Sequence, residues 1–204
     1  LTDTQAVTLS INDVNEAPVI TSSATVAIDE NIGAGQVVYT VTSTDVDASA
    51  TVTYSLSGTD ASLFTIDSTS GEVTLIANPN FENKSSYSFN VIATDNGTLT
   101  DTQAVTLSIN DVNEAPTVSN DNIDVKLSFG DAYQKDVSGL FSDIDFDNVF
   151  TYEAINLPLG LTMNSSTGVI SGRANSSGEF KVIIKVTDNG TPALSVSRTY
   201  NMLV

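Results

Sequence analysis

Apolar and polar residues alternate with a period of two along many short stretches of this chain. Such alternation is typical of β-strands that bury one face and expose the other. The stretches are also rich in valine, isoleucine, tyrosine and threonine, which favour strands. They read QVVYTVTST, TVTYSLS, EVTLIA, YSFNVIAT and QAVTLSIN. No helical period persists over several turns, so the pattern predicts an all-β protein.

Turn-forming residues separate these predicted strands. Glycine, asparagine and serine adopt the backbone angles that tight turns require. They occur at Asn31-Ile32-Gly33, Ser57-Gly58, Asn96-Gly97 and Asn189-Gly190. Strands and turns at this spacing predict β-sandwiches of about seven strands within about 100 residues each.

An internal repeat sets the domain organisation. The segment LTDTQAVTLSINDVNEAP occupies residues 1–18 and recurs unchanged at 99–116. The offset between the copies has the size of one small domain, which indicates tandem modules in a repetitive parent protein. Two weaker repeats accompany it. STDVD resembles FSDID at the same spacing, and ATDNGT resembles VTDNGT.

We therefore predict two tandem Greek-key β-sandwiches. Module one spans residues 17–111, a linker spans 112–116, and module two spans 117–204. Residues 1–16 duplicate the last strand and linker of module one. They are expected to be the last strand and linker of a preceding repeat, either unpaired or added to the edge of a neighbouring sheet.

The composition narrows the classes of partner. Among 204 residues, 25 are acidic and 7 are basic, for a net charge of −18. Binding to nucleic acid needs a basic surface, so this class is excluded, and an anionic membrane is disfavoured for the same reason. Solubility alone would account for the acidity. Multivalent cations are the other natural explanation, since they neutralise clustered carboxylates.

The absence of two residue types excludes further chemistry. The chain has no cysteine and therefore neither disulfides nor thiolate metal sites. It has no histidine, the commonest general base. No apolar run reaches the length that a membrane-spanning helix needs, so we predict no membrane insertion.

The acidic residues of module one concentrate at the ends of predicted strands and in connections. They include Asp29-Glu30, Asp45-x-Asp47, Glu82, Asp95 and Asp111-Val-Asn113-Glu114. Calcium takes six to eight oxygen ligands from carboxylates, amides and carbonyls. Each motif alone is more often a turn, because Asp bonds its own backbone. Together, at the poles of a sandwich, they favour a calcium site.

Module one resembles a cadherin repeat over nearly its whole length. The resemblance rests on four motifs in family order: IDENIGAGQVVYTVTSTDVD, SLFTIDSTSGEVTLIANPNFEN, SYSFNVIATDNG and INDVNEAP. Module two resembles the dystroglycan-type, cadherin-like modules of large bacterial surface proteins and adhesins. The marks there are NLPLGLTM with STGVISG, followed by VTDNG.

The resemblance implies calcium at the junction between the modules. The implied ligands at this short linker are Glu30, Glu82, Asp111, Asn113, Glu114, Asp143, Asp145 and Asp188. A partial site at the other pole of module one would use Asn15, Asp45, Asp47 and Asp95. No comparable linker follows module two, and we predict no calcium at its far end.

Three functions fit these features to different degrees. The resemblance implies an extracellular, cell-surface adhesion or extender module of a bacterial protein, made rigid by Ca²⁺. Its partners would be neighbouring modules of the same chain and a polysaccharide or another cell-surface protein.

The alternative is a calcium-dependent carbohydrate-binding module of a polysaccharide-degrading or matrix-binding protein. The absence of Trp weakens it, because sugar platforms use exposed aromatics; Tyr133, Phe146 and Phe150 are its best candidates. Aspartate pairs serve glycosidases, but calcium ligands and turns explain them better, so we predict no enzyme.

Overall fold

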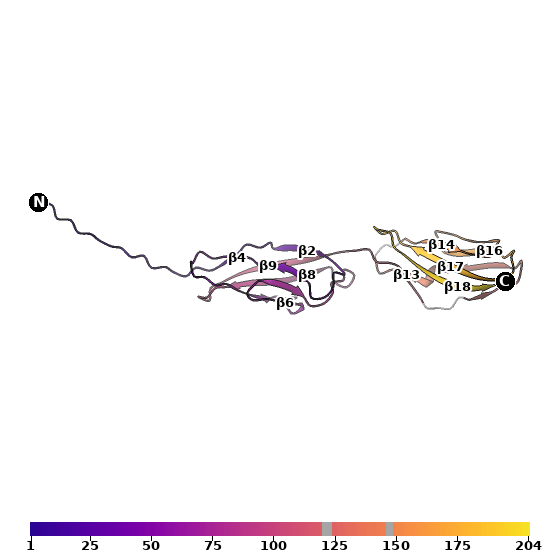
Figure 1. The fold of residues 1–204 in the computed structure, drawn as a ribbon, viewed down its shortest axis with the longest axis horizontal. Coiled ribbons are helices and arrows are strands. Elements are labelled where there is room, and N and C mark those ends of the chain that lie inside the picture. The colour runs from indigo at the N-terminus through magenta and orange to yellow at the C-terminus, as the bar shows by residue number, and fades with distance from the viewer. Residues whose placement is uncertain (120–123, 146–148) are drawn as a thin grey trace. The chain divides into compact units, whose positions relative to one another are not determined.

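The computed structural model describes residues 1–119, 124–145 and 149–204. It divides into two compact units, Leu1–Val112 and Asn113–Val204, which are described separately below. The regular secondary structure of both units is almost entirely β-strand, joined by turns and connections (Figure 1). The all-β prediction is confirmed.

Unit 1 is a sandwich of a four-stranded and a three-stranded sheet, with a short third pairing. Its strands are β1 (Val19–Ile20), β2 (Thr25–Asp29), β3 (Val37–Thr40), β4 (Ser43–Thr44), β5 (Thr53–Ser57), β6 (Phe64–Ile66), β7 (Glu72–Leu75), β8 (Ser86–Thr94) and β9 (Thr100–Asn110). One 3₁₀ turn, η1 (Ala61–Leu63), precedes β6. The sheet orders are β2-β9-β8-β5, β3-β7-β6 and β1-β4.

The first strand of unit 1 changes partner along its length. β1 pairs antiparallel with β4, whereas β2 pairs in parallel with β9. The strand that follows is likewise split into β3 and β4. Counting each split strand once leaves the seven strands expected from the spacing of turns.

Unit 2 repeats this topology. Its strands are β10 (Thr117–Val118), β11 (Val125–Lys126), β12 (Ala132–Asp136), β13 (Phe141–Ser142), β14 (Thr151–Ile155), β15 (Leu161–Met163), β16 (Val169–Arg173), β17 (Glu179–Thr187) and β18 (Ser195–Leu203), with the turn η2 (Ser138–Leu140). The sheet orders are β11-β18-β17-β14, β12-β16-β15 and β10-β13. The parallel pairing of β11 with β18 matches that of β2 with β9.

The alternation seen in the sequence places one side of each strand in a core. In unit 1, Phe89 and Val91 of β8 and Leu107 of β9 belong to one core cluster. Phe64 also belongs to it, and the centroids of the Phe64 and Phe89 rings are 4.6 Å apart. The core of unit 2 contains Val182, Ile184 and Val186 of β17. Of the aromatics considered for sugar binding, Tyr133 and Phe150 pack against this core, and Phe146 lies outside the described residues.

The duplicated segment adopts two different states. In β9, Val105, Leu107 and Ile109 are 1%, 0% and 3% exposed, because β9 is paired on both sides by β8 and β2. The identical residues Val7, Leu9 and Ile11 are 85%, 84% and 89% exposed. Residues 1–17 form no strand. The same sequence therefore becomes a strand only where neighbouring strands offer it hydrogen bonds and an apolar face.

No helix among the described residues is both long and apolar enough to cross a membrane.

Candidate metal centre

Glu30 is a buried carboxylate at the end of β2. Its side chain is 2% exposed, and both oxygens accept backbone hydrogen bonds. Oε2 accepts from the N–H of Phe81 at 2.8 Å, and Oε1 accepts from the N–H of Val112 at 2.9 Å. A carboxylate has about four lone-pair positions, so both oxygens retain capacity for a cation. Glu30 thus ties the turn around residue 81 to the segment that leaves β9.

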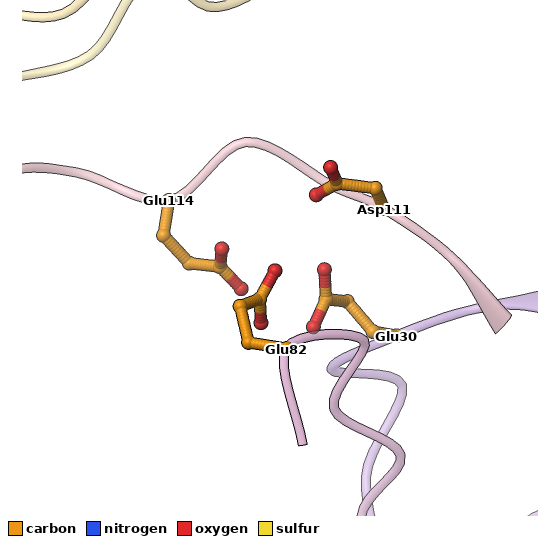
Figure 2. Close-up of side chains that lie close together, drawn as sticks. All are labelled: Glu30, Glu82, Asp111 and Glu114. Atoms are coloured by element: carbon orange, nitrogen blue, oxygen red, sulfur yellow. The ribbon is translucent and has the colours of Figure 1, made fainter. Parts of the chain in front are cut away.

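Three more carboxylates gather beside Glu30. The carboxylate oxygens of Glu30, Glu82, Asp111 and Glu114 lie within 4.8 Å of one another (Figure 2). Glu82 is presented by a turn in which Asn80 Oδ1 accepts from the N–H of Asn83 at 2.7 Å. Asp111 directly follows β9, and Glu114 belongs to the connecting segment. Four negative charges at this separation repel one another unless a cation lies among them.

In unit 2, the connecting segment is fixed to a second acidic group. Nδ2 of Asn113 donates to Oδ2 of Asp188 at 3.1 Å, and the N–H of Glu114 donates to Oδ2 of Asp145 at 2.9 Å. The N–H of Asp145 in turn donates to Oδ1 of Asp143 at 3.2 Å. These contacts bring together the predicted residues of unit 2 around residues 113 and 114.

The pKa values of two of these aspartates shift in opposite directions. Burial opposes ionisation of Asp188, but hydrogen bonds from Leu194, Asn113 and Gly190 outweigh it and hold its pKa below the usual value. The pKa of Asp143 is raised, chiefly because burial disfavours its charged form. The negative charge of Asp145 adds to this rise, while the hydrogen bond from the backbone of Asp145 partly opposes it. A neighbouring cation would offset the cost that burial imposes on the charged form of Asp143.

The opposite pole of unit 1 carries the same arrangement. Nδ2 of Asn15 donates to Oδ2 of Asp95 at 2.8 Å, and the N–H of Glu16 donates to Oδ2 of Asp47 at 3.0 Å. The N–H of Asp47 donates to Oδ1 of Asp45 at 2.9 Å. The four residues of the predicted partial site are thus connected through the copy of the linker at residues 13–16.

Two residues at this pole were missed from the sequence. Carboxylates of Asp13, Glu16 and Asp47 lie within 4.8 Å of one another. Incomplete hydration raises the pKa of Glu16, with further contributions from the charges of Asp47 and Asp13. The signal was present: Asp13 and Glu16 occupy the places of Asp111 and Glu114 in the duplicated segment.

Two glycines let the linker asparagines approach. A Cβ atom on Gly97 would lie 2.5 Å from Nδ2 of Asn15, and one on Gly190 would lie 1.6 Å from Oδ1 of Asn113. Neither position tolerates a side chain without moving the asparagine. The Asp-Asn-Gly motifs at 95–97 and 188–190 therefore supply both an acceptor for the linker amide and the space that it occupies.

The donor set suits a hard divalent cation. Oδ2 of Asp45 and Oδ2 of Asp143 are buried, and neither accepts a hydrogen bond from the described residues. Such atoms are costly unless paired. The surrounding oxygens are carboxylates and amides, the ligands that Ca²⁺ prefers. The assignment of individual residues as calcium ligands stays a prediction.

The fold and these poles define a class: tandem β-sandwiches with clustered carboxylates at their poles. Residues 24–110 match the family model "Cadherin domain", and residues 115–204 match the "Putative Ig domain" model. The first unit is thus a cadherin domain and the second an Ig-like domain; a dystroglycan-type assignment of the second is not what this match gives.

Curated relatives are cadherin adhesion proteins. Human Protocadherin Fat 1 is 29% identical over 99% of this chain and 5% of its own length. Protein dachsous of Drosophila melanogaster is 34% identical over 56% of the chain and 3% of its own length. The chain thus spans a small part of these relatives. They are adhesion proteins and not enzymes, in agreement with the prediction that this chain is not an enzyme.

Solved cadherin structures share the fold. Human Protocadherin-24 EC1-2 superposes with a TM-score of 0.71 at 19% identity, covering 93% of this chain and 99% of that one. Mouse Cadherin-23 EC22-24 gives 0.65 at 23% identity, covering 92% and 64%. These likenesses show that the chain has the fold of two tandem cadherin-like domains.

Proposed function

We propose that the chain is a calcium-dependent extender and adhesion module, made rigid by Ca²⁺ held at the linker. The supporting observation is the double anchoring of residues 112–114. The N–H of Val112 bonds Glu30, while the N–H of Glu114 bonds Asp145 and the side chain of Asn113 bonds Asp188. Acidic clusters of both units are thus fixed to the same short stretch of backbone.

The residues that would hold the cations divide into two sets. Glu30, Glu82 and Asp111 come from unit 1, and Asp143, Asp145 and Asp188 come from unit 2, with Asn113 and Glu114 from the linker. When bound, Ca²⁺ supplies positive charge that offsets the repulsion within each set. Fixing both sets to common ions would restrict the linker.

An extracellular setting suits such a site. Extracellular calcium modules have dissociation constants of about 10⁻⁴–10⁻³ M, close to the calcium level outside cells. By mass action, a native-state ligand at a concentration near its Kd stabilises a fold by about 0.4 kcal/mol per site, and at about 100 times its Kd by about 2.7 kcal/mol per site. We infer a cell-surface location, on a long repetitive protein of bacterial type. The identical segments at 1–18 and 99–116 support the repetitive parent.

The test is calcium titration of the chain and of the double variant Asp143→Ala/Asp145→Ala, followed by calorimetry. The proposal expects heat of binding and a raised melting temperature for the natural chain, and loss of the junction sites in the variant. Glu153→Ala, which removes an exposed carboxylate from the middle of β14, serves as the control and should bind as the natural chain does. Unchanged binding in the double variant would contradict the assignment.

A further inference from the structure

A groove of about 690 Å³ lies on unit 2 at the end of its four-stranded sheet. It is formed by β11, by the beginning of β17, by the end of β18 and by Asn156 just after β14. Its size falls in the range of about 300–1,000 Å³ that small-molecule sites occupy. Lys181 in the groove and Asp188 at the acidic pole lie toward opposite ends of β17, about 20 Å apart along an extended strand. The groove is therefore separate from the candidate metal centre.

The polar side chains of the groove include both hydrogen-bond donors and acceptors, and a ligand hydroxyl group can pair with both. Carboxylates only accept, ammonium groups only donate, and amides do both. The groups are Asp124, Lys126, Asn156, Glu179, Lys181 and Asn201. The apolar lining residues are Val125, Phe180, Met202 and Leu203. Met202 is 5% exposed and belongs to the core, whereas Leu203 is 40% exposed and offers apolar surface to a ligand.

Several of these groups are held in place before any ligand binds. Oδ1 of Asp124 accepts from the backbone N–H of Asn201 at 3.0 Å and from its Nδ2 at 3.2 Å. Nδ2 of Asn156 donates to the carbonyl of Lys181 at 3.1 Å. Asn156 has a φ of 65°, a left-handed conformation that asparagine tolerates better than most residues. Such preorganisation lowers the entropic cost of binding.

The charges select the class of ligand. Unit 2 holds six of the seven basic residues of the chain: Lys126, Lys135, Arg173, Lys181, Lys185 and Arg198. Within the described part of the chain, no ion pair within 4.0 Å joins Lys126 or Lys181 to a carboxylate. Among the lining residues that the structure describes, two carboxylates and two ammonium groups balance in charge. A polyanion would meet Asp124 and Glu179, whereas a neutral ligand bearing many hydroxyl groups meets complementary donors and acceptors.

We propose that this groove binds a neutral oligosaccharide. The hydroxyl groups of the sugar pair with the carboxylates, amides and ammonium groups, and its C–H surface covers Leu203 and the neighbouring apolar atoms. Because none of these residues belongs to the acidic poles, binding does not require calcium. The proposal for the groove can therefore be tested independently of the proposed calcium-stiffened linker.

The test probes the whole chain against an array of neutral and acidic oligosaccharides, in calcium and in EDTA. Neutral hits are then titrated by calorimetry and followed through the amide signals of Lys181 and Asn201. The proposal expects binding of neutral oligosaccharides in both solutions. Lys181→Met should weaken it at least tenfold, since it keeps the length of an exposed side chain and removes its donors.

Lys135→Met is the matched control, because Lys135 is an exposed lysine of β12 in the other sheet. It should bind as the natural chain does, and thermal melting should show both variants folded. The proposal is overturned if no neutral oligosaccharide binds, if only acidic sugars or acidic peptides bind, if EDTA abolishes binding, or if both variants lose affinity equally.

Discussion

The side-chain amide of Asn113 donates to the carboxylate of Asp188 across 3.1 Å, where the absence of a side chain on Gly190 leaves room for it. The same relationship joins Asn15 to Asp95 beside Gly97 at 2.8 Å. Each linker asparagine thus fits a site built by an Asp-Asn-Gly turn. The arrangement is common to two units whose sequences have otherwise diverged.

Replacement of Gly190 tests this fit. Gly190→Ala would place Cβ 1.6 Å from Oδ1 of Asn113 and should displace that side chain from Asp188. Overpacking of this kind costs about 1–3 kcal/mol. We expect a lower melting temperature of unit 2 and weaker calcium binding, both measured by calorimetry.

Gly139→Ala is the control, because a Cβ there meets no atom within 4 Å and the backbone is not left-handed. It should leave stability and calcium affinity unchanged. If both variants behave as the natural chain, Asn113 does not need the space beside Gly190.

The Asp143 carboxylate should destabilise the fold in the absence of calcium and stabilise it when calcium is bound. Burial raises its pKa, so its ionised form at neutral pH destabilises the calcium-free fold. A group whose pKa is raised in the folded state contributes stability below its usual pKa of 3.8, and this contribution is lost as the pH rises through the folded pKa. Asp143→Asn should therefore raise the melting temperature in EDTA at neutral pH.

In calcium, the same variant should melt below the natural chain and bind calcium at least about tenfold more weakly, since even changes outside the ligand sphere cost 10–100-fold. Asp136→Asn provides the comparison: its carboxylate is exposed and held at a lowered pKa, chiefly by hydrogen bonds from Ser138. That variant should be slightly less stable in both solutions. An Asp143→Asn variant that is destabilised equally with and without calcium would refute the account of Asp143.

The prediction from sequence succeeded where a motif carries its own local geometry. The alternation in YSFNVIAT specified which face of β8 is buried, and the Asp-Asn-Gly turns marked the ends of strands that carry Asp95 and Asp188. It did not include Asp13 and Glu16, although they occupy the places of Asp111 and Glu114 in the duplicated segment. Their closeness to Asp47, more than 30 residues away along the chain, became visible only in the fold.

Whether residues 1–12 form a strand also could not be predicted from the sequence alone. Val7 and Val105 have identical neighbours in sequence, yet one is exposed and the other buried. Strand formation depends on partners distant along the chain. The groove of unit 2 escaped prediction for a similar reason, since the register of β17 with β18 sets Lys181 opposite Asn201.

Asp60 should make unit 1 sensitive to acid. Its Oδ1 lies 2.8 Å from Nζ of Lys84, its Oδ2 accepts from the N–H of Ser88, and the hydrogen bond from Lys84 is the main cause of its lowered pKa. A lowered pKa contributes stability above the usual value of 3.8 that is lost as pH falls through the folded value. Asp60→Asn should cost about 1–2 kcal/mol at pH 7, a range reduced for the partial exposure of Lys84.

Urea unfolding of both proteins at pH 7 and near pH 2.5 measures this effect. The difference between them should shrink toward the lower pH, because the natural carboxyl becomes protonated as the pH falls through its folded pKa. Asp131→Asn, at an exposed aspartate of unit 2, is the control and should be neutral. An Asp60→Asn difference that is constant with pH would show that the charge of Asp60 does not stabilise unit 1.

The central claim is that calcium restricts the linker, and small-angle X-ray scattering of the chain tests it most directly. Scattering is recorded in millimolar calcium and in EDTA, for the natural chain and for Asp143→Ala/Asp145→Ala. The account predicts that calcium narrows the distribution of intramolecular distances in the natural chain alone. Identical distributions in calcium and EDTA for the natural chain, at calcium levels that saturate binding, would contradict it.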